Sequence, residues 1–181
     1  MSEPLTREEE LACLKLARQA LEHYFKTGSQ LHSPIKSGTL KEKRGAFVTL
    51  TVDGELRGCI GYPLPVKPLD ETIIEMAVAA ASQDTRFEPV EAKELTHLKI
   101  EVSVLGLPER IEDAGKVEVG RHGIIVSKGY NRGLLLPQVP VEYGWDRETF
   151  LSHGCLKAGL RPDEWKKGVE IEVFTAQVFS E

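Results

Sequence analysis

The feature that most constrains this fold is an apolar run that reverses direction at a two-residue turn signal. Residues 46–52 alternate apolar and polar side chains, Asp53-Gly54 follows, and an extended stretch returns through Leu56-Arg57-Gly58-Cys59-Ile60-Gly61. Asp-Gly suits a two-residue hairpin, because glycine readily adopts the positive φ that such a turn needs. The pattern therefore predicts an antiparallel hairpin that ends in this hexapeptide.

The hexapeptide itself predicts a site. Gly58 and Gly61 flank Cys59, and glycine inside a strand usually marks a bulge or a place where a ligand or another backbone comes close. Regular pleating would point Arg57 and Cys59 to the same face, because they are two residues apart. A cation, a bare backbone and a thiol would then lie together. The alternative is that Cys59 is a small buried hydrophobic residue between two glycines.

The charge balance bears on which partners the chain could bind. The 181 residues carry a formal net charge of -5, which argues against a sequence-independent DNA binder with a broad basic surface. A local cluster formed by Lys36, Lys41, Lys43 and Arg44 leaves a nucleic-acid contact open, although a solvated loop explains the same cluster. Nucleic-acid binding is therefore not the favoured function.

The three cysteines and the N-terminus indicate the compartment. Cys13, Cys59 and Cys155 are widely separated, odd in number and without a C-x-x-C pair, so we expect reduced thiols and no disulfide scaffold. The polar opening Ser2-Glu3-Pro4 does not resemble a signal peptide, and no apolar run is long enough to span a membrane. We expect a cytoplasmic protein with no membrane attachment.

Helical signals occur in several places. Thr6-x-x-Glu9 is a capping box, and the apolar spacing that follows predicts a helix to about Thr27, ended by Gly28. Asp70 opens a second helix that is rich in alanine and able to pack closely against another element. Two further helical segments are predicted by the N-cap Asp146 with Gly159 at its end, and by Pro162 before Trp165.

The remaining apolar runs predict strands. They cover residues 98–104, a stretch from 121 to 126, a turn at 130–133 followed by a buried strand that Pro137 ends, and one last strand holding Ile171, Val173 and Val178. Hairpins mixed with helices, without regular βαβ alternation, indicate the α+β class, with a mainly antiparallel sheet and helices on one face. We expect a single domain over residues 1–181, with a smaller lobe within about 110–170 and a cleft beside the Cys59 strand.

Common catalytic signatures are absent from the sequence. It contains no Walker A loop, no G-x-G-x-x-G, no H-E-x-x-H and no G-x-S-x-G. His153 and Cys155 are the only close pair of soft metal ligands, and two residues apart on a helix they do not share a face. We therefore predict neither a metal site nor a bound cofactor.

The strongest catalytic candidates are Cys59 and His122. A nucleophilic cysteine reacts as its thiolate, and a nearby histidine or cation favours that form. His122 lies at the entrance of a predicted strand, where its ring could be exposed, although a surface or hydrogen-bonding histidine is the alternative. Sequence spacing does not tell whether the two residues meet.

Other polar residues stand at places suited to binding. Asp84-Thr85-Arg86-Phe87 follows the second helix and is either a solvated turn or a binding loop. Gln138, Glu142 and Trp145 follow a buried strand and could supply amide, carboxylate and stacking groups. Each of these residues is compatible with a purely structural role.

Taken together, ordered motifs along nearly the whole chain resemble one family. The hexapeptide 56–61 is similar to the hallmark of the AMMECR domain family, whose prokaryotic members are called AmmeMemoRadiSam system protein A. Further matching segments follow in the family's order: Asp84-Thr85-Arg86-Phe87, Glu101-Val102-Ser103-Val104-Leu105, Arg121-His122-Gly123-Ile124, Leu135-Leu136-Pro137-Gln138-Val139 and the run from Trp145-Asp146 through Phe150-Leu151 to Cys155-Leu156-Lys157-Ala158-Gly159-Leu160. The family most often has Pro where this chain has Thr85.

The resemblance implies an α+β fold with a larger and a smaller lobe, and motif residues gathered at the cleft between them. It also implies association with a Memo-type protein, similar to extradiol dioxygenases, and with a radical SAM enzyme. The family's own activity is not established. Arg57, Cys59, Arg86, His122 and Gln138 are carried over as candidate cleft residues, without assigned steps.

Two hypotheses follow for the function. The first is an enzyme, or a subunit of one, acting on a small or nucleotide-like substrate. Cys59 would be the nucleophile or covalent acceptor, and His122 its base or proton donor. Arg57 and Arg86 would hold an anionic group, because arginine binds such groups through paired hydrogen bonds. The second hypothesis is a non-catalytic adaptor or regulatory module that contacts partner proteins, or RNA, through the arm from Lys36 to Arg44 and the exposed loop that holds Arg86 and Phe87.

Overall fold

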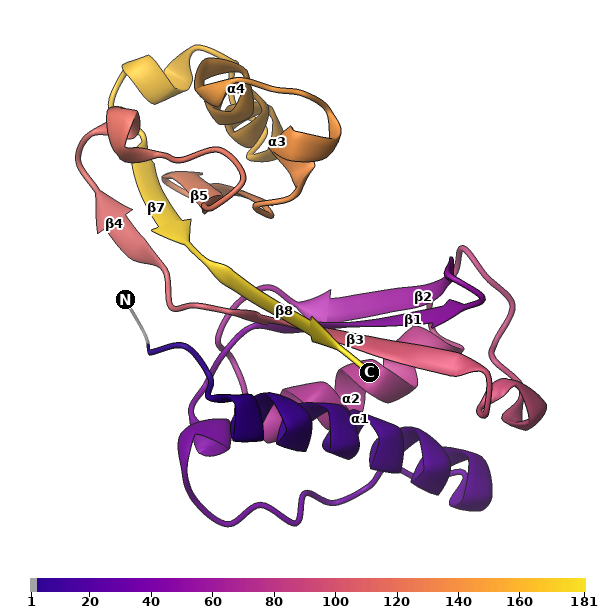
Figure 1. Cartoon of the computed structure of the whole chain (residues 1–181). Helices are drawn as coiled ribbons and strands as arrows, with labels where there is room; N and C mark the ends of the chain where they lie inside the picture. The colour runs from indigo at the N-terminus through magenta and orange to yellow at the C-terminus, as the bar shows by residue number, and fades with distance from the viewer. Residues whose placement is uncertain (1–2) are drawn as a thin grey trace. The chain divides into compact units, whose positions relative to one another are not determined.

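The chain folds into two compact units, each with its own core and its own sheet. A computed structural model describes residues 3–181 (Figure 1). The larger unit comprises Glu3–Leu105 and Gln177–Glu181, and the smaller unit comprises Gly106–Ala176. No helix within residues 3–181 has the length and apolar character needed to cross a membrane.

The larger unit is a four-stranded sheet with two helices on one face (Figure 1). In sheet order the strands are β2 (Glu55–Tyr62), β1 (Ala46–Val52), β3 (Leu98–Leu105) and β8 (Ala176–Ser180). The helices are α1 (Arg7–Thr27) and α2 (Leu69–Ser82), with short 3₁₀ turns η1 (Thr39–Lys41) and η2 (Ala92–Glu94). Apolar side chains from both helices and from all four strands form one core.

Helix α1 confirms its predicted ends. The Thr6 side chain accepts a hydrogen bond from the Glu9 amide, and the Glu9 carboxylate accepts one from the Thr6 amide, so both halves of the capping box are present. Gly28 ends the helix with φ 71°. Cys13 is fully buried on the apolar face of the helix, as its position beside the predicted stripe indicated.

The hairpin is confirmed, but it contains a β-bulge that the sequence pattern did not predict. Asp53 (φ 51°) and Gly54 (φ 82°) form the two-residue turn between Val52 and Glu55. The register then shifts between Leu50 and Thr51, so that Arg57 is an extra residue in β2. Through such a bulge the regular pleat does not hold, and the pleating argument for a shared face of Arg57 and Cys59 no longer applies.

Gly58 explains why the returning strand carries a glycine at this position. A Cβ atom at Gly58 would lie 2.1 Å from the carbonyl oxygen of Ala80 in α2. The predicted close approach is therefore that of a helix backbone, and the small residues Ala77, Ala80 and Ala81 are buried where α2 meets the sheet. Strand and helix can pack at this distance only because neither presents a side chain at the contact.

The smaller unit has a second four-stranded sheet, with its own core. In sheet order its strands are β4 (Glu109–Ile111), β7 (Glu170–Phe174), β5 (Gly123–Lys128) and β6 (Asn131–Leu135). Its helical segments are η3 (Ala114–Lys116), α3 (Val139–Glu142), α4 (Arg147–Lys157) and η4 (Glu164–Lys166). Asp146 caps α4 by accepting a hydrogen bond from the Thr149 amide, as predicted.

The α+β class is confirmed, while several local predictions are corrected. One sheet was expected and two are present, and the predicted last strand is two strands, β7 and β8, that belong to different sheets. The turn predicted at 130–133 lies at 129–130, because Gly129 supplies the positive φ (61°) and residues 131–135 pair with β5. Strand β6 therefore ends before Pro137.

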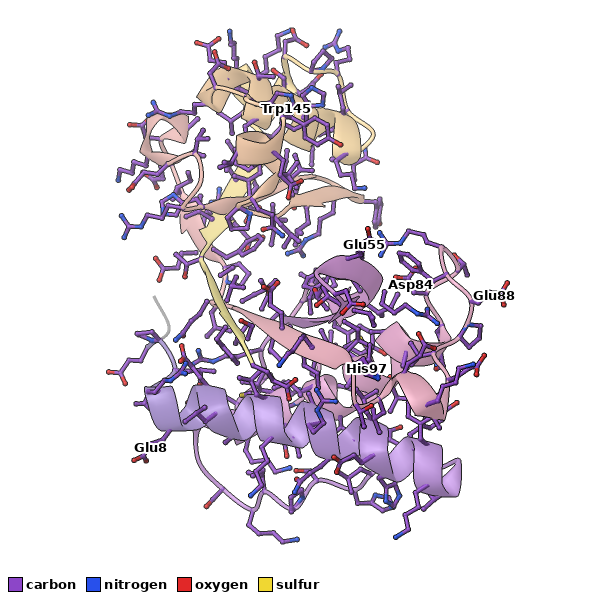
Figure 2. All side chains as sticks on the ribbon, turned by 45° about the vertical axis from the view of Figure 1, so that its right-hand side comes forward. Glu8, Glu55, Asp84, Glu88, His97 and Trp145 are labelled. Carbon is purple, nitrogen blue, oxygen red and sulfur yellow. The ribbon has the colours of Figure 1, made fainter. Side chains whose placement is uncertain are left out.

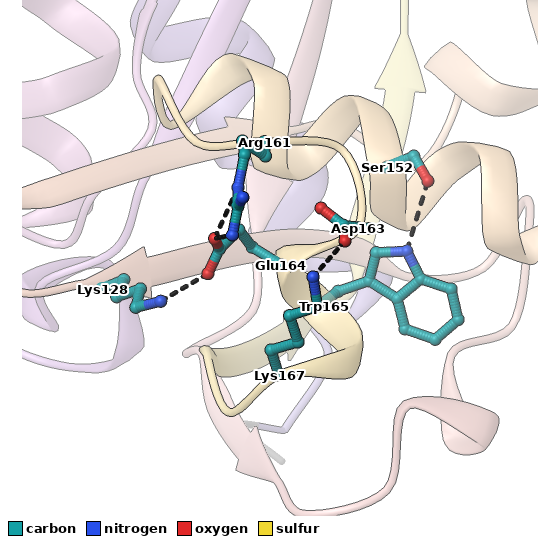
Figure 3. A network of polar contacts seen from close by, with 7 residues as sticks. All are labelled: Lys128, Ser152, Arg161, Asp163, Glu164, Trp165 and Lys167. Carbon is teal, nitrogen blue, oxygen red and sulfur yellow. Dashed lines mark hydrogen bonds and ion pairs between the residues drawn. The ribbon is translucent and has the colours of Figure 1, made fainter.

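A buried carboxylate organises the end of the smaller unit (Figure 3). Glu164 accepts hydrogen bonds from Lys128 and from Arg161, and the neighbouring indole of Trp165 donates to Ser152 (3.2 Å). These two cations hold the pKa of Glu164 below its usual range, the Lys128 hydrogen bond contributing most. The network joins the hairpin β5–β6 to the segment that leads into β7.

The contact at Gly58 makes a stability prediction. Gly58→Ala should lower the free energy of unfolding by about 3 kcal/mol, because the new methyl group meets backbone that cannot rotate away. Urea denaturation followed by circular dichroism measures the loss. Glu55→Ala, at an exposed position of the same strand, is the control and should change stability by only about 0.5 kcal/mol. Equal stability of Gly58→Ala and the parent protein would contradict this account of the packing.

Candidate thiol site and the predicted cleft residues

Cys59 lies on the edge strand of the larger unit, on the side of the sheet away from the helices. It pairs with Thr49, whose neighbours Val48 and Leu50 point into the core beneath the sheet. The Thr49 hydroxyl donates a hydrogen bond to the sulfur of Cys59 at 3.2 Å. Cys59 is partly exposed, whereas Cys13 and Cys155 are fully buried. The interpretation of Cys59 as a buried hydrophobic residue is therefore wrong.

The backbone of Cys59 is held by Asp84, in the loop that follows α2 (Figure 2). The Cys59 amide donates to Oδ2 of Asp84 at 2.9 Å. This N–H thus points away from β1, which makes Thr49 and Cys59 a non-hydrogen-bonded pair, the type in which facing side chains approach most closely. The carboxylate also covers a donor that an open sheet edge would otherwise present to other strands.

Arg86 lies against the same carboxylate. Its Nε and Nη2 atoms donate to Asp84 at 2.9 and 2.7 Å, a paired geometry typical of arginine and carboxylate. The hydrogen bonds from Arg86 hold the pKa of Asp84 well below its usual range, and the Cys59 amide adds to the effect. The Arg86 side chain is nevertheless 56% exposed. Within residues 3–181 its Nη1 atom has no hydrogen-bond partner, so this guanidinium can still bind an anion.

Arg57 is engaged inside the chain. Its Nε and Nη2 atoms donate to the two carboxylate oxygens of Glu94 at 2.8 and 3.1 Å, and Nη1 donates to the backbone oxygen of Glu88 at 2.7 Å. Arg57 thereby ties the loop between α2 and β3 to the bulge in β2. Its donors are used in this role, so of the two predicted anion-binding arginines Arg86 is the one left with a free donor.

His122 lies in the smaller unit, beside a cavity of about 420 Å³. The ring is buried, and its Nδ1 atom accepts a hydrogen bond from the backbone amide of Glu118 at 3.2 Å. An atom that accepts a hydrogen bond carries no proton, so the neutral ring is protonated at Nε2. In this state the imidazole can donate a hydrogen bond from Nε2, but it has no free lone pair to act as a base.

Gln138 and its neighbours are also in the smaller unit. Gln138 is exposed immediately before α3, and only its backbone oxygen is bonded, to the Glu142 amide (3.0 Å). The Trp145 ring (Figure 2) stacks between Tyr143, at 5.0 Å between centroids, and His153, at 3.8 Å. The predicted stacking residue is therefore already stacked within its own unit.

The candidate residues divide between the two units. Cys59, Arg57 and Arg86 belong to the larger unit, and hydrogen bonds to Asp84 bring Cys59 and Arg86 together. His122 and Gln138 belong to the smaller unit. The pairing of Cys59 with His122, and the cleft that would contain both, stay predictions. Among residues 3–181 no group of three or more His, Cys, Asp or Glu side chains is placed to hold a metal ion.

Sequence reasoning missed the two direct partners of the thiol site. A hairpin with a two-residue turn and no bulge would place Thr49 opposite Gly58, and only the extra residue Arg57 moves it opposite Cys59. Asp84 was recognised as part of a loop, but its role is set by the approach of α2 to β2. The glycine within the strand was the available signal for a bulge, although it did not give the bulge's position.

Comparison with known proteins gives consistent matches along the chain. A family model described as AMMECR1 matches residues 14–179. A protein of Methanopyrus kandleri is 52% identical, covering 100% of this chain and 92% of its own, and one of Methanocaldococcus jannaschii is 47% identical, covering 98% and 92%. The crystal structure of the uncharacterised protein PH0010 from Pyrococcus horikoshii is 46% identical, with a TM-score of 0.82 over 98% of this chain and 93% of that one.

The exposure of the three thiols predicts their relative reactivity. In the native protein iodoacetamide should alkylate Cys59 roughly tenfold or more faster than the other two cysteines, because a thiol must be reachable and able to ionise. Burial raises the pKa of Cys13 to about 12 and also raises that of Cys155. Peptide mass spectrometry at timed quenches measures each rate. Denaturant should make all three react alike, and a native Cys59 as slow as Cys13 would contradict the assignment of an accessible thiol.

The Asp84 carboxylate predicts a pH-dependent contribution to stability. Because its folded-state pKa is depressed, the contribution is fully present above its unfolded pKa of about 3.9 and is lost as the pH falls. Asp84→Asn should cost about 2 kcal/mol at neutral pH, since an amide NH₂ would replace one of the two oxygens that receive donors from Arg86 and Cys59.

Urea unfolding of both proteins between pH 7 and pH 3 measures this difference, which should shrink below about pH 4. Glu55→Gln changes an exposed carboxylate in β2, the strand that contains Cys59 (Figure 2). It is the matched control and should show little difference in stability at any pH. A constant difference across the whole range would show that the charge of Asp84 does not stabilise the fold.

Proposed function

We propose that this chain, which belongs to the AMMECR1 family, is an enzyme or an enzyme subunit that acts on a small anionic, nucleotide-like substrate through the thiol of Cys59. One observation carries the proposal. Among the three cysteines, all within residues 3–181, Cys59 alone is partly exposed, and its sulfur accepts a hydrogen bond from Thr49. Its backbone amide donates to the same Asp84 carboxylate that binds the half-exposed Arg86.

Each neighbour of the thiol has a role in this proposal. The Thr49 hydroxyl donates a hydrogen bond to the sulfur and so orients the atom that would react as a nucleophile. Asp84 fixes the backbone of Cys59 and the plane of the Arg86 guanidinium. The free edge of that guanidinium binds a phosphate or carboxylate of the substrate. Arg57 positions the strand by holding the Glu94 loop, and does not itself bind substrate.

The two candidate residues of the smaller unit, His122 and Gln138, have separate roles in the proposal. His122 acts as a hydrogen-bond donor through Nε2–H and not as the base for a thiol, because the Glu118 amide occupies its Nδ1 atom. Gln138 contributes an exposed amide for substrate contact. A Memo-like protein and a radical SAM enzyme are the proposed partners, on the strength of the family resemblance alone. The cytoplasm is the proposed compartment, because three widely separated cysteines suit a reducing environment.

The contacts of residues 36–44 argue against the RNA-binding form of the adaptor hypothesis. Lys41 forms an ion pair with the buried Asp70 at 2.8 Å, and the Arg44 guanidinium is buried against the backbone oxygen of Glu3. Two of the four cations of the arm are thus used within the larger unit. Lys36 and Lys43 alone make a weak basic patch, so a purely RNA-binding function is not favoured.

Protection of Cys59 from alkylation tests the proposed substrate site. Adenosine 5′-monophosphate, a nucleotide-like anion, should slow the reaction of Cys59 with iodoacetamide several-fold by occupying Arg86. Arg86→Gln should abolish this protection, because it removes the cation. The matched control is Arg110→Gln, an exposed arginine of the smaller unit, which should leave the protection intact.

Reconstitution with Memo-like and radical SAM proteins tests the catalytic part. Cys59→Ser should abolish the activity of the assembled system, while Cys155→Ser, at a buried cysteine, should retain it if the protein folds. Full activity of Cys59→Ser would refute the thiol mechanism. Protection by the nucleotide that persists in Arg86→Gln would refute only the assignment of Arg86.

A further inference from the structure

A cavity separate from the thiol site lies wholly within the smaller unit. The cavity of about 420 Å³ opens between β4, β7 and the loop that follows η3. Its volume falls in the range of pockets that bind small molecules. All of its lining residues come from residues 106–175, so its geometry does not depend on the larger unit.

One wall of the cavity is apolar. Leu107, Ile111, Val173 and Phe174 line it, and Leu107 is 43% exposed although it is a large hydrophobic residue. The Phe174 ring lies over Gly123, where an added Cβ would come within 2.2 Å of a ring atom. The glycine that follows His122 therefore makes room for the aromatic wall. Such a surface favours a ligand with an apolar, preferably planar, body.

His122 contributes a directed hydrogen-bond donor. With Nδ1 bonded to the Glu118 amide, the remaining ring nitrogen of the neutral histidine is an N–H. The buried side-chain nitrogen and oxygen atoms that lack a partner in the described chain are Nε of Arg44 and Oδ1 of Asp70. Nε2 of His122 is not among them and has no partner within residues 3–181, so it is open to the cavity that the ring lines.

The charges around the cavity restrict the ligand further. Glu118 forms an ion pair with Arg121 at 3.1 Å, and Glu109 is also engaged. Lys116 lines the cavity without an ion-pair partner among residues 3–181. The side-chain groups left to meet a ligand are Nε2–H of His122, the Lys116 ammonium and the remaining N–H groups of Arg121, since only Nη1 of Arg121 has a partner within residues 3–181. All of them are donors. The nearby carboxylates would repel a multiply charged phosphate, whereas a single carboxylate can accept from His122 and Lys116.

From this arrangement we infer that the smaller unit has its own binding site for a small monocarboxylate with an apolar or aromatic body. The carboxylate accepts hydrogen bonds from His122 and Lys116, and the body packs against Phe174 and Leu107. The inference goes beyond the proposed thiol function, because it uses neither Cys59 nor Arg86 and holds even if the thiol is inert.

Nuclear magnetic resonance of the ¹⁵N-labelled full chain tests the site, with phenylacetate as the probe. The imidazole nitrogens of His122 should first show the Nε2–H tautomer. Phenylacetate at millimolar concentration should then shift the His122 ring and the Gly123 amide. Phenylacetamide and phenethylamine, the neutral and cationic analogues, should bind more weakly, the amine by about tenfold or more, because it has no acceptor.

Substitutions locate the bound probe. His122→Phe should lower the affinity for phenylacetate about tenfold by removing the donor while keeping a ring, and His153→Phe is the matched control, at a histidine stacked on Trp145 outside the cavity. Lys116→Gln, at an exposed position, should also weaken binding and is expected to leave the fold intact. Cys59→Ser should leave binding unchanged, which separates this site from the thiol function.

Three results would overturn the inference. They are an Nδ1–H tautomer of His122, equal binding of the amine and the carboxylate, or unchanged affinity in both His122→Phe and Lys116→Gln. If His122→Phe fails to fold, the Lys116→Gln titration and the analogue series still decide the outcome.

Discussion

The candidate thiol site depends on the contact between the backbones of β2 and α2 at Gly58 and Ala80. No side chain separates strand from helix there, because a Cβ at Gly58 would overlap the Ala80 carbonyl oxygen. Helix α2 ends two residues later, at Ser82, so the loop that follows begins beside the strand. Asp84 can then reach the amide of Cys59 directly. A larger residue at either position would move the carboxylate away from the thiol.

The same loop gives Arg57 and Arg86, the two candidate anion-binding arginines, different hydrogen-bond partners. Arg57 donates hydrogen bonds to Glu94 and to backbone oxygens, and so fixes the loop to the bulge. Arg86 binds Asp84 through Nε and Nη2, and Nη2 also donates to the backbone oxygen of Cys59, so that within residues 3–181 Nη1 is the nitrogen left without a partner. Equal charge on neighbouring motifs therefore does not mean equal function, since hydrogen-bond partners decide which cation remains available to a ligand.

In the smaller unit, too, a hydrogen-bond partner decides the chemistry of a side chain, that of His122. A backbone amide at Nδ1 leaves the neutral ring with a donor and no free acceptor, independent of what lies opposite it. This hydrogen bond changes the chemistry available to His122 from base to donor. It also places an N–H donor beside the apolar wall of the cavity. Phe174 can form part of that wall because Gly123 has no side chain. The chemistry of each unit can thus be argued from its own contacts.

Short-range patterns in the sequence were enough to predict the local structure. The capping box at Thr6, the turn at Asp53-Gly54 and the α+β class follow from them, because capping, positive φ and periodic burial act between neighbouring residues. Three features emerge only in the folded chain: Arg57 forms a bulge, Thr49 faces Cys59, and the end of the chain divides between two sheets. Those features depend on contacts between residues far apart in the chain, and a one-residue shift in register leaves no mark in local sequence.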